Sequence, residues 1–93
     1  MQDDLNTLRR RLDETDRVLV RAFEERMRVS LAIADCKRAA GLPVSDPGRE
    51  ALVLSTRADM LEDPRWREPL KDLYQTLMRL SREAQRQRLE AGE

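Results

Sequence analysis

Two basic residues, Arg26 and Lys37, are spaced so that both could act on one anionic ligand. They are eleven residues apart, and eleven steps along a helix return to within about 20° of the same face, roughly 16 Å further along the axis. Arg26 also falls where the helical pattern expects an apolar residue, and a buried guanidinium needs an anionic partner. The partner of Arg26 could equally be an acidic residue of the chain, or Arg26 could lie in solvent. The spacing alone therefore does not decide between a ligand site and ordinary charged residues.

A third basic residue, Arg9, lies on another face of the same predicted helix. It is turned about 100° from Arg26, so the two cannot easily share a site within one chain. In a dimer, Arg9 could reach the site of the partner chain. The alternative is a solvated surface arginine, which is the usual condition of such residues.

Two further groups of polar residues accompany predicted helices. Ser81 and Gln85 form an i, i+4 pair beside an apolar stripe, which suggests a wet or ligand-filled interior, although helix-edge polarity is the simpler interpretation. Asp46, Arg49 and Glu50 gather at the start of another helix, where free amides suit an anion. Asp46 could already occupy those amides as a cap.

The composition excludes several kinds of chemistry. The chain has 93 residues, no His, one Cys, and 18 basic against 18 acidic side chains, so His-based triads, His-based metal sites and multi-Cys metal sites are excluded. We interpret Cys36 as a packing residue. A net charge of zero argues against nucleic-acid binding, and no apolar run is long enough to span a membrane. A single cysteine and an acidic N-terminus without an apolar stretch lead us to expect a cytoplasmic location.

The elements that must position these residues are helices. Charged residues make up 39% of the chain and hydrophobic residues 40%, with only three Gly and four Pro, which favours an all-α fold in one domain over residues 1–93. The pattern predicts a long helix from Asp4 to Ala39, ended by Gly41 and Pro43. A second helix should run from Pro47, capped by Asp46, to about Met60. A third should begin near Pro69 and reach about Leu89.

The length of the first predicted helix indicates a second chain. About 36 residues give a helix of roughly 54 Å, whereas a compact chain of this size has a diameter of about 30–35 Å. An apolar stripe on the overhanging part would be left in water, so a partner should cover it. We therefore expect an intertwined homo-oligomer, most simply a two-fold homodimer.

Read in order, five stretches of the chain resemble the all-helical class of chorismate mutases. They are Leu8 to Asp16, Glu25 to Met27, Ile33 to Lys37, Gly41 to Glu50, and Leu80 to Gln85. The resemblance implies an intertwined homodimer of three-helix chains. It also implies the Claisen rearrangement of chorismate to prephenate on the route to Phe and Tyr, with no cofactor and no metal.

The resemblance further implies which residues form the site. One chain would contribute Arg26, Lys37, Asp46, Arg49, Glu50, Ser81 and Gln85, and the other chain would contribute Arg9. The substrate is a dianion, so Arg9 and Arg26 would bind its carboxylates as forked donors. Lys37 and Gln85 would donate to the ether oxygen as its bond breaks.

The remaining residues of this set have supporting roles under the same resemblance. Glu50 would accept a hydrogen bond from the ring hydroxyl, helped by the backbone near Asp46. Ser81 would bond a carboxylate, and Arg49 would support the charge balance. The rearrangement is unimolecular, so holding the substrate in a chair-like geometry is the main requirement.

Three alternatives remain open at the level of sequence. The first is a related enzyme on the same fold, an isochorismate–pyruvate lyase or a 4-amino-4-deoxychorismate mutase, because substrate choice among close analogues depends on one or two contacts. The second is a non-catalytic helical dimer, in which Arg26, Lys37 and Gln85 would find internal partners. The third is a coiled-coil adaptor, which the prolines and the charged heptad position disfavour.

Overall fold

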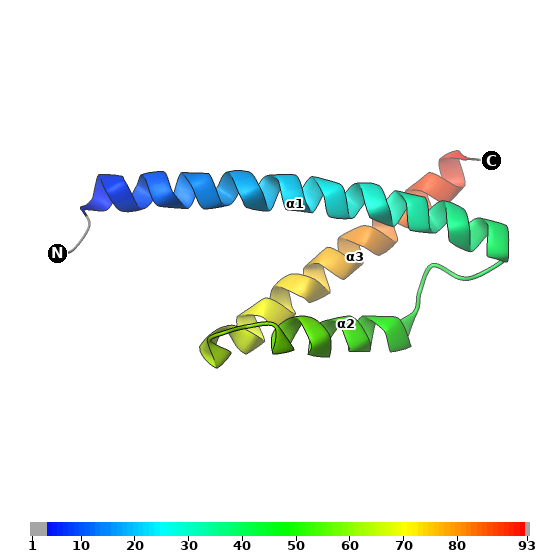
Figure 1. Ribbon diagram of the computed structural model, residues 1–93. Helices are drawn as coiled ribbons and strands as arrows, with labels where there is room; N and C mark the ends of the chain where they lie inside the picture. Colours follow the sequence, from blue (N-terminus) through cyan, green and yellow to red (C-terminus); the bar gives the residue numbers. More distant parts are fainter. Residues whose placement is uncertain (1–3, 93) are drawn as a thin grey trace.

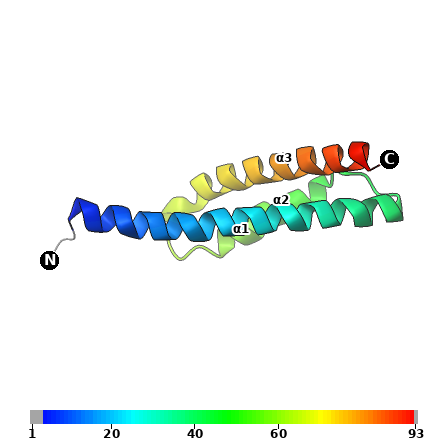
Figure 2. The same ribbon diagram turned by 90° about the horizontal axis from the view of Figure 1, so that it is seen from above.

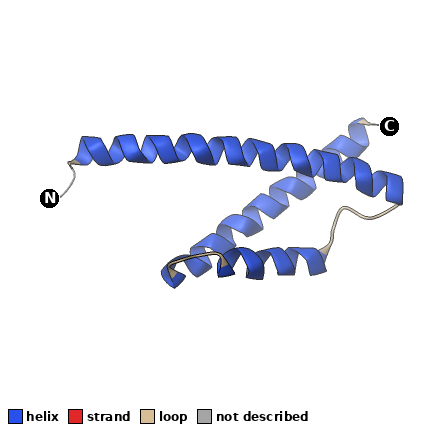
Figure 3. Cartoon of the chain, viewed as in Figure 1, coloured by secondary structure: helices blue, strands red, loops and turns tan. Residues whose placement is uncertain are grey.

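The computed structural model describes residues 4–92, and these residues form helices joined by short connections (Figures 1 and 3). The elements are α1 (Leu5–Ala40), α2 (Pro47–Asp59), the single 3₁₀ turn η1 (Pro64–Trp66) and α3 (Arg67–Ala91). No strand occurs within residues 4–92, so the prediction of an all-α chain with three helices is confirmed. Residues 1–3 and 93, the ends of the predicted domain, lie outside the described residues.

The ends of α1 follow from its sequence. The side chain of Asp4 caps the first turn by accepting a hydrogen bond from the Thr7 amide at 2.7 Å. Gly41 ends the helix with φ of 68°, a left-handed conformation that costs glycine little. Its amide and that of Leu42 donate to the last carbonyl groups of α1. The helix therefore matches the predicted span to within one residue at each end.

The start of α2 also agrees with the sequence. The Asp46 carboxylate accepts a hydrogen bond from the Arg49 amide at 3.0 Å, and Pro47 is the first helical residue. The capping role predicted for Asp46 is thus confirmed. Asp63 caps η1 in the same way through the Arg65 amide at 2.9 Å.

The three helices are held together through α3. This helix runs diagonally across α1 and packs along α2 (Figures 1 and 2). Within residues 4–92, α1 and α2 make no close backbone contact with each other. The N-terminal part of α1, blue in Figure 1, extends beyond the other helices, and no other described element lies beside it. In the view of Figure 1, α1 and α2 thus lie apart from each other, and α3 passes behind both.

The single chain has very little hydrophobic core. Among the described residues, the buried hydrophobic side chains are Ala34, Val53, Ala58 and Met78. Large apolar residues along α1 remain exposed, including Leu5, Leu8, Leu12, Leu19 and Phe23. The radius of gyration is 16.9 Å, against about 12 Å for a compact chain of this length. The chain exposes 7414 Å², about 1,800 Å² more than a typical folded monomer of its mass.

Two smaller predictions can be compared with this arrangement. The sequence suggests a packing role for Cys36, but this residue is exposed in the single chain, because the packed face of α1 is the one that includes Ala34 and Lys37. No helix in the described part of the chain is long and apolar enough to cross a membrane.

Candidate active site

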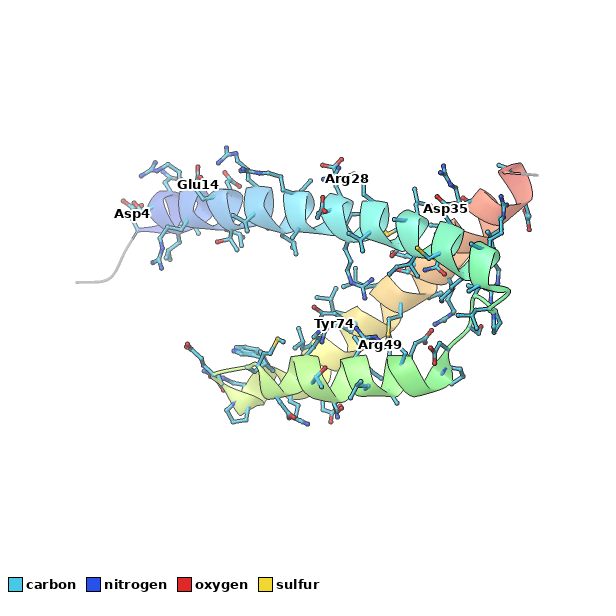
Figure 4. All side chains as sticks on the ribbon, turned by 45° about the vertical axis from the view of Figure 1, so that its right-hand side comes forward. Asp4, Glu14, Arg28, Asp35, Arg49 and Tyr74 are labelled. Atoms are coloured by element: carbon cyan, nitrogen blue, oxygen red, sulfur yellow. The ribbon has the colours of Figure 1, made fainter. Side chains whose placement is uncertain are left out.

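A cavity of about 390 Å³ lies between the three helices. Its walls come from the second half of α1, from α2 and the loop before it, and from the second half of α3. In Figure 4 the labelled Arg49 and Tyr74 lie in the space between α1 and α2, whereas Glu14 and Arg28 lie on the outer side of α1. Asp35 lies further along α1, where it pairs with Arg88 of α3. The sequence-predicted residues that line this cavity are Arg26, Lys37, Asp46, Arg49, Glu50, Ser81 and Gln85.

Arg26 enters the cavity from α1 and is held there by two neutral groups. Its Nη1 donates to the hydroxyl of Ser81 at 2.9 Å, and its guanidinium lies 5.6 Å from the centre of the Tyr74 ring. Within residues 4–92, no ion pair joins Arg26 to a carboxylate. The internal acidic partner that the sequence left open is therefore not found, and the charge remains available to a ligand.

Ser81 connects this arginine to the rest of the core. The Ser30 hydroxyl donates to the Ser81 oxygen at 3.0 Å, and both serines are buried. Since the Ser81 oxygen accepts from two donors, its own hydrogen is free to point elsewhere. Arg26 is thus fixed in orientation before any ligand arrives.

Lys37 lies eleven residues after Arg26 on α1 and lines the same cavity, as the spacing predicts. Its Nζ donates to the backbone oxygen of Val44 at 2.7 Å and to Oε1 of Gln85 at 3.3 Å. An ammonium group has three donors, so one remains for a ligand. Because Gln85 uses its oxygen on Lys37, its amide nitrogen is the part left to donate.

The α2 side of the cavity contains an ion pair that the sequence did not reveal. Glu50 accepts a hydrogen bond from Nη1 of Arg82 on α3 at 2.5 Å. Arg57 also lines the cavity, and its Nη1 donates to the Thr56 hydroxyl at 3.0 Å. Arg57 follows Glu50 by seven residues, which places both on one helix face, so this spacing could have identified it. No sequence spacing indicates that Arg82 lines the cavity, because its position there depends on how α3 packs against α2.

The cavity is strongly cationic although the chain is neutral. Its cationic side chains are Arg26, Lys37, Arg49, Arg57 and Arg82, and its carboxylates are Asp46 and Glu50. The lining therefore has a formal charge of +3 in a chain of net charge zero. Such a concentration of like charge is costly in a half-enclosed space unless an anion offsets it.

Arg9 is the one predicted site residue that does not line the cavity. It lies in the second turn of α1 (Leu5–Ala40), and it is exposed. This placement agrees with the expectation that Arg9 cannot share the site within one chain. Its entry into the site of a partner stays a prediction.

Comparison with known proteins identifies the family. The model of the family described as chorismate mutase type II matches residues 8–86, which include every residue of the cavity lining. The chain therefore belongs to this family. Searches of curated proteins and of solved structures found no significant match.

Proposed function

We propose that this protein is a chorismate mutase that rearranges chorismate to prephenate on the route to Phe and Tyr. The observation that carries the proposal is the cavity with a formal charge of +3, in which the partners of Arg26 and Lys37 among the described residues are all neutral. This arrangement suits a small dianion. The reaction breaks one C–O bond and forms one C–C bond within a single molecule, so it needs no nucleophile.

Arg26 and Lys37 have different roles in this proposal. Arg26, oriented by Ser81, binds a substrate carboxylate through its remaining N–H groups. Lys37 and the amide of Gln85, which contact each other, donate to the ether oxygen as negative charge develops on it. Donors fixed in place before reaction stabilise that charge without reorganisation.

We further propose that the working form is an intertwined homodimer in which Arg9 of the partner subunit completes each site. Two features support a second copy: the excess exposed surface of about 1,800 Å² and the exposed apolar residues along α1. A second copy of α1 presents the same stripe, so each chain can cover the other by two-fold symmetry. The second carboxylate of the substrate would then bind Arg9.

The direct test adds purified protein to chorismate, follows the loss of ultraviolet absorbance and identifies the product by chromatography. Prephenate is the expected product, and Lys37→Ala should lower kcat/KM at least about 100-fold. Lys71→Ala is the matched control, because Lys71 lies on α3 outside the cavity and pairs with Glu68. Pyruvate released from isochorismate, with chorismate left untouched, would assign the lyase instead.

Mixing of inactive variants tests the shared site. Arg9→Ala and Lys37→Ala should each be inactive, but mixed dimers contain one intact site in two. After complete random exchange about a quarter of all sites should be intact. As the control, mixing Arg26→Ala with Lys37→Ala should restore nothing, because both residues belong to the same chain's cavity. Equal behaviour of the two mixtures would refute a site shared between chains.

A further inference from the structure

The ion pair between Glu50 and Arg82 differs from a surface salt bridge. It joins α2 to α3, with 2.5 Å between Nη1 of Arg82 and Oε1 of Glu50. The side chain of Arg82 is 28% exposed and that of Glu50 is 29% exposed. By contrast, the pair between Arg79 and Glu83 lies on α3 alone, and its side chains are 53% and 50% exposed. Both Glu50 and Arg82 also line the cavity. The pair is therefore part of the surface that a ligand would contact.

Apart from Asp46, the charged residues that line the cavity with Glu50 are cationic. Arg49 and Arg57 of α2 and Lys37 of α1 line the same cavity. In the described part of the chain Arg82 is the one cation bonded to the Glu50 side chain, and it contacts the Oε1 atom. Within residues 4–92 the other carboxylate oxygen, Oε2, accepts no hydrogen bond, so it can accept one from a ligand. A ligand group that binds at Oε2 therefore contacts a carboxylate whose other oxygen is bonded to the guanidinium of Arg82.

This pairing affects neutral and charged ligand groups differently. A hydroxyl donates to the carboxylate oxygen and carries no charge, so the nearby guanidinium does not repel it. An alkyl amine is a cation at neutral pH, and a cation bound at Glu50 would also lie close to Arg82. Like charges that approach within a few ångströms in a partly desolvated site disfavour binding. The pair therefore accepts a hydroxyl and rejects an ammonium group.

We propose that Arg82 is a specificity-determining residue, which makes the site prefer a substrate with a ring hydroxyl over its analogue with an amino group at that position. The inference rests on the proposed mutase function, because it places the ring substituent at Glu50. It adds a role for a residue that neither the sequence pattern nor the family match assigns. Removing the charge of Arg82 would leave Glu50 as an unpaired carboxylate, which attracts an ammonium group.

The experiment compares kcat/KM for chorismate with kcat/KM for 4-amino-4-deoxychorismate. The ratio of the two values is expected to fall by about tenfold or more in Arg82→Met, which corresponds to about 1.4 kcal/mol. Arg82→Gln retains a hydrogen-bond donor without the charge and should shift the ratio in the same direction. Arg82→Lys retains the charge and should keep the ratio within about threefold of wild type.

The control and the readout separate specificity from stability. Arg79→Met removes an arginine from the same helix outside the cavity, and it should leave the ratio unchanged. A purely structural role for Arg82 would lower both kcat/KM values together and leave the ratio unchanged in every Arg82 variant. That outcome, with an active wild type, would overturn this inference alone. A wild type that converts neither substrate would overturn the proposed function and this inference with it.

Discussion

Truncation of one leucine on the projecting part of α1 should weaken a homodimer by a predictable amount. Leu12 is 60% exposed in the single chain, and full burial of a leucine side chain is worth about 1.5–3 kcal/mol. Covering its exposed part is then worth about 1–2 kcal/mol per chain. A two-fold dimer contains the contact twice, so Leu12→Ala should cost about 2–4 kcal/mol and raise the dimer Kd roughly 30- to 1,000-fold.

Sedimentation of a fluorescently labelled chain over a dilution series would measure this Kd. Glu14→Ala is the matched control, because Glu14 is turned about 160° away from Leu12 around the helix and pairs with Arg17 on the same helix. Both variants introduce alanine into α1, so their effects on helix propensity are small. The reasoning would be refuted if the wild type sedimented as a monomer at all concentrations, or if Leu12→Ala and Glu14→Ala gave the same Kd.

Three further predictions concern the cavity and the far end of α3. Gln85→Glu should lower kcat/KM at least about 100-fold at neutral pH, because a carboxylate cannot donate to the ether oxygen, and acid should restore part of the activity; a flat, low profile between pH 4 and 8 would contradict this role. Gly92→Ala would bring a Cβ atom to 2.9 Å from Nη1 of Arg38. Nη1 donates to the Gly92 carbonyl at 2.8 Å, and Nη2 of the same residue donates to the Leu89 carbonyl at 2.6 Å. The substitution should lower the free energy of unfolding by about 1 kcal/mol, but it should have no such effect when Arg38 is already alanine. Urea unfolding of wild type, Gly92→Ala, Arg38→Ala and the double variant would test this. The hydrogen bond from Arg88 lowers the pKa of Asp35 below its ordinary value of 3.8, so its stabilising effect is present above about pH 3.8 and is lost as pH falls through the lower folded value. Asp35→Asn should therefore melt slightly below wild type at pH 7, and the difference in Tm should disappear in strong acid; a difference that is independent of pH would contradict the linkage.

The helices could be predicted because their signals are local. Gly41 and the Asp46–Pro47 pair act on the backbone next to them, so the ends of α1 and α2 follow without knowledge of the packing. The shared face of Arg26 and Lys37 is equally local, since it depends only on the helical repeat. These parts of the site could therefore be predicted from the sequence.

The resemblance implies that Arg26, Lys37, Asp46, Arg49, Glu50, Ser81 and Gln85 share one site, and all seven line the cavity. The individual contacts between helices could not be predicted from the spacing. Arg82 becomes part of the cavity only because α3 lies beside α2, which brings it to Glu50. The neutral partners of Arg26 arise in the same way, since Ser81 and Tyr74 both come from α3. The exposure of Cys36 also follows from which face of α1 meets α3. No spacing within one helix contains this information.

The charge of the cavity has a consequence for how a substrate reaches it. The whole chain has a net charge of zero, and the lining has +3, so the remaining surface has −3. Charges further apart than about 10 Å are largely screened at 0.1 M salt. A distant dianion is therefore not steered toward the protein as a whole, and attraction begins only near the mouth of the cavity. A long polyanion meets the negative outer surface first, so the cavity selects for anions small enough to enter it.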